Sequence, residues 1–110
     1  MNADTRASVS IVRCESYEAT KLCEAVAKVA NEGDMPSVSG KTILLKPNIL
    51  SDSSPEDCIT TNPEFVRATI KFLKDCGAKE IHVGDSPGLH SPTFEGRRCG
   101  IKDVCDEEGA

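Results

Sequence analysis

The sequence predicts an α/β fold in which a short parallel sheet is flanked by helices. Short segments rich in β-branched and apolar residues alternate with amphipathic stretches, in the order strand, helix, strand, helix, strand, helix. Strands separated by helices are joined by right-handed crossovers and therefore lie parallel. The 110 residues are enough for one domain, which we place at residues 1–110. Because the pattern stops after a helix, we expect an incomplete sheet and the N-terminal fragment of a longer protein.

The first strand is expected at residues 8–13, where two valines and an isoleucine favour extended backbone. Ser16 is expected to cap the following helix, with Glu18 in its first turn, where the helix dipole favours a negative charge. Gly33 is expected to end this helix in a left-handed conformation. The helix has apolar residues at helical spacing: Leu22, Val26 and Val29.

The second strand is expected at residues 41–46, with the sequence KTILLK. Its continuous apolar run is typical of a parallel strand that is covered on both faces. Pro47 ends the strand, since proline cannot donate to a ladder. Residues 48–61 have no periodic pattern, and a loop of this length in a small domain is usually functional or disordered.

The second helix begins at Asn62 as the cap and Pro63 as the first helical residue, and it is expected to end at Gly77. The third strand is expected at residues 80–83, followed by a turn-rich GDSPG loop. Ser91 and Pro92 indicate the start of a short helix over residues 93–99. A further helical segment is expected over residues 101–108, after a break at Gly100.

Polar residues follow the second and third strands at the edge where open parallel sheets bind ligands. We expect Lys46 and Asp85 to face the same crevice, in an arrangement that suits an anionic or carboxylate-bearing small molecule. The alternative is an ion pair between Lys46 and Asp85 beside an ordinary turn. Residues 60–64 could likewise dock an anion or simply cap a helix. Catalytic residues are not identified. The ligand-binding candidates are Lys46, Asn48, Thr61, Gly84, Asp85, Ser86, Gly88 and His90.

The composition argues against nucleic acid and membrane as partners. The net charge is −5, aromatic residues make up 4% and tryptophan is absent, so neither a basic footprint nor a base-stacking platform is present. No apolar run approaches the ~20 residues of a membrane span. The N-terminus lacks a signal-peptide core. We therefore predict a cytoplasmic protein.

Six cysteines are present, but none is spaced as a zinc or iron–sulfur ligand pair. We expect free thiols, with Cys23 and Cys76 on helix faces, and no metal or cofactor in this segment. The alternative is a metal-binding fragment that uses some of Cys58, His90, Cys99 and Cys105.

Four segments together resemble the start of the domain of unknown function 362 family: VRCESY, ILLKPNIL, ITTNPEFVRATIKFLKDCGAKEIHVGDSPG and GIKDVCDEEGA. The resemblance covers residues 9–110 and includes the motifs LLKPN, TTNPE and GDSPG in order. It implies that the chain is the N-terminal part of a longer protein. It also implies an association with a ferredoxin-type four-iron four-sulfur cluster in the full-length parent. The matching motif positions are Lys46, Pro47, Asn48, Thr61, Pro63, Gly84, Asp85, Ser86 and Gly88.

Two further function classes accompany the metal-binding alternative. The first is a domain that binds an anionic small molecule within an iron–sulfur-associated redox protein, and whether it is an enzyme is left open. The second is a non-catalytic α/β module for interaction or scaffolding. An exposed sheet edge also predicts self-association.

Overall fold

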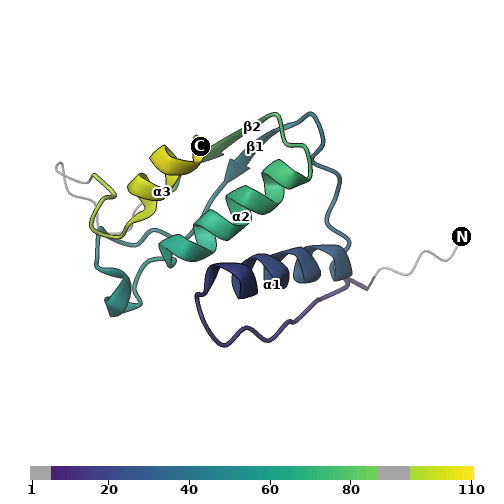
Figure 1. Cartoon of the computed structure of the whole chain (residues 1–110), viewed down its shortest axis with the longest axis horizontal. Helices are drawn as coiled ribbons and strands as arrows, with labels where there is room; N and C mark the ends of the chain where they lie inside the picture. Colours follow the sequence, from purple (N-terminus) through teal and green to yellow (C-terminus); the bar gives the residue numbers. More distant parts are fainter. Residues whose placement is uncertain (1–5, 87–94) are drawn as a thin grey trace, which may run out of the picture.

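The computed structural model describes residues 6–86 and 95–110. It confirms a small α/β fold, with helices and a parallel sheet in the order α-β-α-β-α (Figure 1). The elements are α1 (Ala19–Glu32), β1 (Thr42–Leu45), the single-turn 3-10 helix η1 (Pro55–Asp57), α2 (Pro63–Asp75), β2 (Glu80–Val83) and α3 (Ile101–Glu108).

The sheet consists of β1 and β2, which pair in parallel with Leu45 opposite Val83. The ladder continues beyond β2, because the Gly84 amide donates to the Leu45 carbonyl at 3.1 Å. Ile43 and Leu45 pack against the core, whereas Leu44 is 70% exposed on the other face. The expectation that β1 is covered on both faces is therefore wrong, since the core lies against one face only and the strand alternation turns Leu44 away from it.

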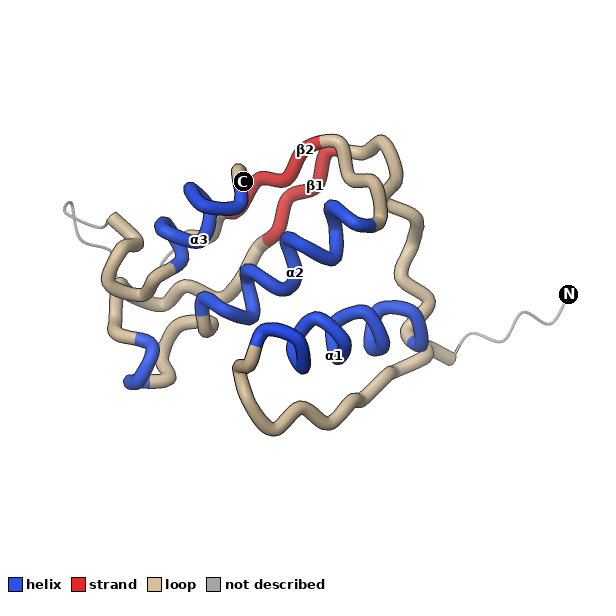
Figure 2. Tube along the Cα trace, viewed as in Figure 1, coloured by secondary structure: helices blue, strands red, loops and turns tan. Residues whose placement is uncertain are grey.

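The expected strand at residues 8–13 does not form. This segment runs as extended coil along the outer side of α1, away from the sheet (Figure 2). Val9 is 81% exposed and Ile11 is 89% exposed. Strand propensity is not sufficient here, because a strand also requires a neighbouring backbone with which to form a ladder.

The N-terminus of α1 is capped by Glu18, two residues later than expected. The Glu18 carboxylate accepts hydrogen bonds from the amides of Thr20 and Lys21, while the Ser16 hydroxyl accepts from the Glu18 amide. Gly33 follows the helix with φ −84°, so its expected left-handed conformation is also wrong. No helix within the two described ranges is long and apolar enough to cross a membrane.

The core surrounds α2, which begins at Pro63 after the Asn62 cap as expected. Val66 and Ile70 are 1% and 0% exposed, and they belong to one cluster with residues of β2 and α3. A second, smaller cluster joins α1 to α2 through Leu22, Val26 and Ala68. After the helix, Gly77 adopts φ +86°, a conformation that glycine tolerates well.

The helix α3 is confirmed at Ile101–Glu108, but residues 95–99 form turns where part of a helix was expected. The remainder of that expected helix, and its cap at Ser91 and Pro92, lie outside the described residues. Gly100 begins α3 at φ +83°, and a Cβ there would lie 2.9 Å from Pro63 Cγ. The left-handed backbone at residue 100 interrupts any helix between residues 99 and 101, and the close approach to the start of α2 favours glycine there.

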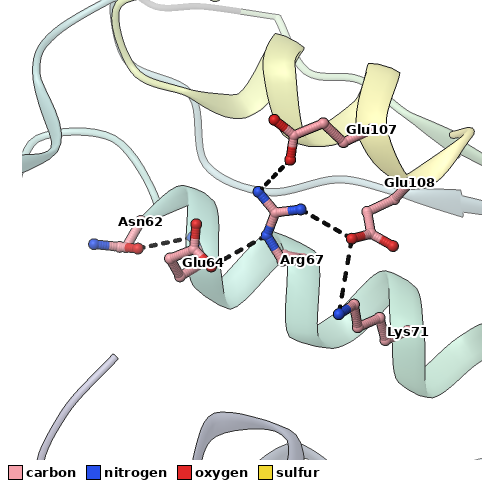
Figure 3. Close-up of polar contacts among 6 residues, drawn as sticks. All are labelled: Asn62, Glu64, Arg67, Lys71, Glu107 and Glu108. Atoms are coloured by element: carbon pink, nitrogen blue, oxygen red, sulfur yellow. Dashed lines mark hydrogen bonds and ion pairs between the residues drawn. The ribbon is translucent and has the colours of Figure 1, made fainter. Parts of the chain in front are cut away.

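An arginine on α2 ties α3 to the rest of the fold (Figure 3). Arg67 donates to Glu108 Oε1 at 2.9 Å and contacts Glu107 at 2.7 Å, both on α3. It also bonds Glu64, one turn earlier on α2, at 3.1 Å. Lys71 lies 3.9 Å from the same oxygen of Glu108.

Candidate functional site

The carboxyl ends of β1 and β2 bring Lys46 and Asp85 together. The parallel register places Leu45 opposite Val83, so the residues that follow the two strands leave the sheet at the same edge. Lys46 Nζ lies 2.6 Å from Asp85 Oδ1. The prediction that these residues occupy the same end of neighbouring parallel strands is confirmed.

Asp85 is held by three groups of the protein. Its side chain is only 6% exposed, and besides Lys46 it accepts hydrogen bonds from the backbone amides of Ile49, at 2.8 Å, and Ser86. The Lys46 ammonium, followed by the Ile49 amide, lowers the pKa of Asp85 from 3.8 to about 2. Asp85 is therefore ionised at neutral pH and joins the loop after β1 to the loop after β2.

Lys46 differs from its partner in exposure. Its side chain is 68% exposed, although the amine is anchored at one point by a buried carboxylate. An ammonium has three N–H donors, and the contact with Asp85 uses one of them. A donor-bearing cation thus stands at the surface of the rim in a defined position.

The two ends of the loop from residue 48 to residue 61 are joined by hydrogen bonds. Both the amide and the hydroxyl of Thr61 donate to the Asn48 carbonyl, at 2.9 and 3.0 Å. The Thr60 hydroxyl donates to the Ser51 carbonyl at 2.6 Å. These threonine hydroxyls hold the loop together in this structure, and the loop is therefore ordered by its own polar groups.

The same loop is also tied to the approach to α3. Asp52 Oδ1 accepts a hydrogen bond from the Cys99 amide at 2.8 Å, and Ile49 is buried at 7% exposure. The sequence did not predict the contact of Asp52 with Cys99 or that of the Ile49 amide with Asp85. The partners are 47 and 36 residues apart, and an aspartate or an isoleucine in an unpatterned loop carries no local signal of so distant a partner.

The N-terminus of α2 has no amide left for an anion among its first residues. Asn62 Oδ1 accepts from the Glu64 amide at 2.8 Å, and the Asn62 carbonyl accepts from the amides of Phe65 and Val66. Pro63 has no N–H. Of the two interpretations of residues 60–64, the structure supports helix capping.

The glycine-rich loop contributes open space beside the rim. A Cβ at Gly84 would meet no atom of residues 6–86 or 95–110 within 4 Å, and Ser86 is exposed. A ligand can therefore approach the backbone closely at Gly84. Gly88 and His90 lie outside the described residues.

The sequence did not indicate the apolar hollow beside Lys46. It has a volume of about 430 Å³ and lies between α1, α2 and the end of β1. Lys46, Pro47 and Asn48 line one part of it and Val26, Phe65 and other side chains the rest, and the lining is almost entirely apolar. These walls come from elements far apart in the chain, so only their packing reveals the hollow.

The cysteines do not form a metal site in the part of the chain that the structure describes, where no group of three or more potential ligands occurs. Cys99 and Cys105 are buried in the core, and burial raises the pKa of both thiols. All six cysteines are free thiols, as expected. Cys76 was expected on a packed helix face, but it is exposed at the C-terminus of α2.

Comparison with known proteins agrees with the motifs at the rim. A family model described as domain of unknown function (DUF362) matches residues 43–110, which include Lys46 and Asp85. The chain belongs to the DUF362 family. The resemblance read from the motifs alone extended further, to residue 9.

A curated relative of this DUF362 chain is the thylakoid-associated protein sll1697 from Synechocystis sp.. The two are 38% identical over 88 residues, which cover 76% of this chain and 27% of the relative. The DUF362 chain thus spans about a quarter of the length of that protein. No solved structure matches the chain.

Proposed function

We propose that this DUF362 chain binds a small anion, a carboxylate or a phosphate, at the carboxyl rim of its parallel sheet. The supporting observation is the contrast within one ion pair. The Asp85 side chain is 6% exposed and accepts from three donors of the protein, whereas the Lys46 side chain is 68% exposed and, among the described residues, pairs with Asp85. In this proposal Lys46 contacts the anion and Asp85 is a positioning residue.

The open space next to Gly84 supports the proposal, because it leaves room for a ligand beside the ammonium. The charge distribution limits the expected affinity for an anion. The pair is formally neutral, and the chain carries a net charge of −5, so no long-range field attracts an anion. Binding depends on short-range, charge-assisted hydrogen bonds from Lys46, and we expect it to weaken as salt increases.

The experiment is a titration with inorganic phosphate, followed by amide NMR at constant ionic strength. Lys46→Met removes the ammonium while retaining the apolar stem, and it should weaken binding by on the order of tenfold. Lys41→Met is the matched control, since Lys41 precedes β1 at the opposite end of the strand. It removes the same charge and should leave phosphate binding unchanged.

Two results would contradict the proposal. In the first, wild-type protein shows no saturable shift of the amides at residues 46–49 and 84–86. In the second, Lys46→Met binds phosphate as wild type does but unfolds at lower urea concentration. The second result would show that the pair with Asp85 only holds the loops together.

For the longer protein we propose, from the family resemblance, an association with an iron–sulfur cluster. The described cysteines of this chain do not fit such a cluster. Four thiolates would have to converge, whereas Cys99 and Cys105 are buried in the core and their pKa values are raised. We therefore assign no residue of this chain to a cluster and derive no redox step from it.

A second candidate function is an interaction module, and one observation favours it. The two-stranded sheet has an open strand edge among the described residues, and Leu44 is 70% exposed on the face away from the core. Open strand edges are typical sites of association. We keep the cytoplasm as the proposed location, which fractionation of cells expressing the natural gene would test.

A further inference from the structure

The apolar hollow beside Lys46 lies along an unpaired strand edge. β1 and β2 form a sheet of two strands, so the edge of β1 that faces away from β2 has no strand partner in the described chain. The hollow is lined by the end of β1 and by no residue of β2, which places it on this open side. Its volume of about 430 Å³ is enough for several apolar side chains.

Residues 8–13 of the chain have the composition of a strand with an apolar face, which suits an open strand edge beside an apolar hollow. Residues 8–13 contain Val9 and Ile11 at a spacing of two, the spacing that places side chains on one face of a strand. Both are more than 80% exposed where they now lie. A strand-forming segment without a strand partner and an open strand edge with an unfilled apolar hollow therefore occur in the same molecule.

The polar contacts that residues 8–13 make in their present place are weak. The Ser10 hydroxyl donates to Glu32 at 3.1 Å on the surface, and Arg13 pairs with Glu15 at 2.7 Å. The side chains of Arg13 and Glu15 are 86% and 70% exposed, and ion pairs with such exposure contribute little. These polar contacts therefore add little to the attachment of the segment to the outer side of α1, where Val12 is half-buried.

The position of α1 supports the same arrangement. α1 packs beside α2, the crossover helix between β1 and β2 (Figure 1). If residues 8–13 pair with β1, α1 becomes the crossover helix of a second unit, on the same face as α2, as consecutive right-handed crossovers require. Residues 14–18 connect the strand to α1, and five residues are an ordinary length for such a connection.

We propose that residues 8–13 dock as a third parallel strand on the free edge of β1. Val9 and Ile11 then enter the hollow, and Arg13 reaches the rim at which Lys46 lies. The occupant is this chain's own segment. The role of Arg13 as a second cation for the anion rests on the proposed function, whereas the docking itself does not.

Two substitutions by aspartate, at Ile11 and at Val12, test the docking. The residue whose substitution destabilises the chain more differs between the present place of the segment and the docked strand. Ile11 is exposed in the present position, whereas Val12 is half-buried. In the docked strand Ile11 enters the hollow and Val12 points away from it. We expect Ile11→Asp to lower the urea midpoint of the full chain more than Val12→Asp. The reverse order overturns the proposal.

Amide hydrogen exchange gives a direct readout that does not depend on a variant. Docking should slow exchange at residues 9–13 in a pattern of alternate residues, as expected for an edge strand. Exchange at the rate of an unstructured peptide overturns the proposal. Protection that disappears on dilution, together with a dimer in sedimentation, also overturns it, because the occupant would then be a second copy.

Phosphate binding tests the role of Arg13 separately. Arg13→Met should weaken phosphate binding about threefold or more, with Lys41→Met again as the control. If Lys46→Met weakens binding and Arg13→Met does not, the role of Arg13 is refuted and the proposed function stands. If wild-type protein binds no phosphate, both are refuted, while the docking is still decided by the exchange pattern.

Discussion

Replacing Arg67 by methionine should loosen the attachment of α3 without disturbing the apolar core. The guanidinium is 21% exposed and contacts three carboxylates, on α2 and α3 (Figure 3). These contacts raise the pKa of Arg67, with Glu107 as the first cause and Glu108 as the second. Methionine keeps the length of the stem, so the substitution tests the polar contacts.

The contacts differ in expected strength. Glu64 and Glu107 are 41% and 59% exposed, so each pair contributes about 0.2–0.5 kcal/mol. Glu108 is 15% exposed, and a hydrogen bond between charged groups in such a place contributes about 1.5–3 kcal/mol. Lys71, at 3.9 Å, compensates only part of the loss. The total is about 2–3 kcal/mol.

The assay is urea unfolding followed by far-ultraviolet circular dichroism. With an m value of about 1.5 kcal/mol/M, the midpoint should fall by about 1.3–2 M. Arg97→Met is the matched control, since Arg97 pairs with Asp103 and Asp106 at the surface and is 53% exposed. It should leave the midpoint unchanged. Equal losses in both variants, or no loss in Arg67→Met, would refute the reasoning.

Four further predictions concern the rim, the core, the thiols and association. Because the pKa of Asp85 is lowered to about 2, its stabilising contribution is complete above pH 3.8 and is lost as the pH falls through about 2; the Ile49 amide shift should report this in NMR. Ile70→Ala should destabilise the fold by about 2–5 kcal/mol in urea unfolding, whereas Leu44→Ala should cost less than about 0.5 kcal/mol. A thiol reagent should modify the exposed cysteines rapidly and the buried ones only on unfolding: Cys14, Cys58 and Cys76 against Cys99 and Cys105. The chain should be marginally stable or self-associate in sedimentation, because the edge of β2 that faces away from β1 has no strand partner among the described residues.

Each of these predictions has a contrary result. An Ile49 shift that titrates near pH 4 would mean that Asp85 is not held as described. A costly Leu44→Ala would mean that the exposed face is covered in solution. Fast modification of Cys99 in the native state would contradict its burial. A monomer with a sharp two-state melt above ~65 °C would contradict the expected association and marginal stability.

The sequence predicted those elements whose signals are local. The second helix could be placed at Asn62-Pro63 because a capping side chain and a first-turn proline act within a few residues. The strands at residues 42–45 and 80–83 were recognisable by their β-branched and apolar composition. Their parallel pairing followed from the intervening helix, and with it the meeting of Lys46 and Asp85.

Three of the errors have a common cause, because each depended on how a distant part of the chain packs. Residues 8–13 have the composition of a strand, but in the described structure they lie along α1 and pair with no strand. The run ILL in β1 suggested burial on both faces, yet the core packs against one face and leaves Leu44 exposed. Cys76 has the helical spacing of a packed residue, but it lies where α2 ends.

The sequence by itself therefore determined the start of α2, the succession from α1 to β1, α2, β2 and α3, and the pair of residues at the rim. These follow from short-range effects: capping, backbone propensity and the handedness of crossovers. Only the tertiary structure decided that Asp85 is buried and bonded to the Ile49 amide, that Lys46 stays exposed, and that a hollow lies beside β1. Burial and cavities depend on which surfaces meet in space, and residues 36 apart along the chain carry no local sign that they will touch.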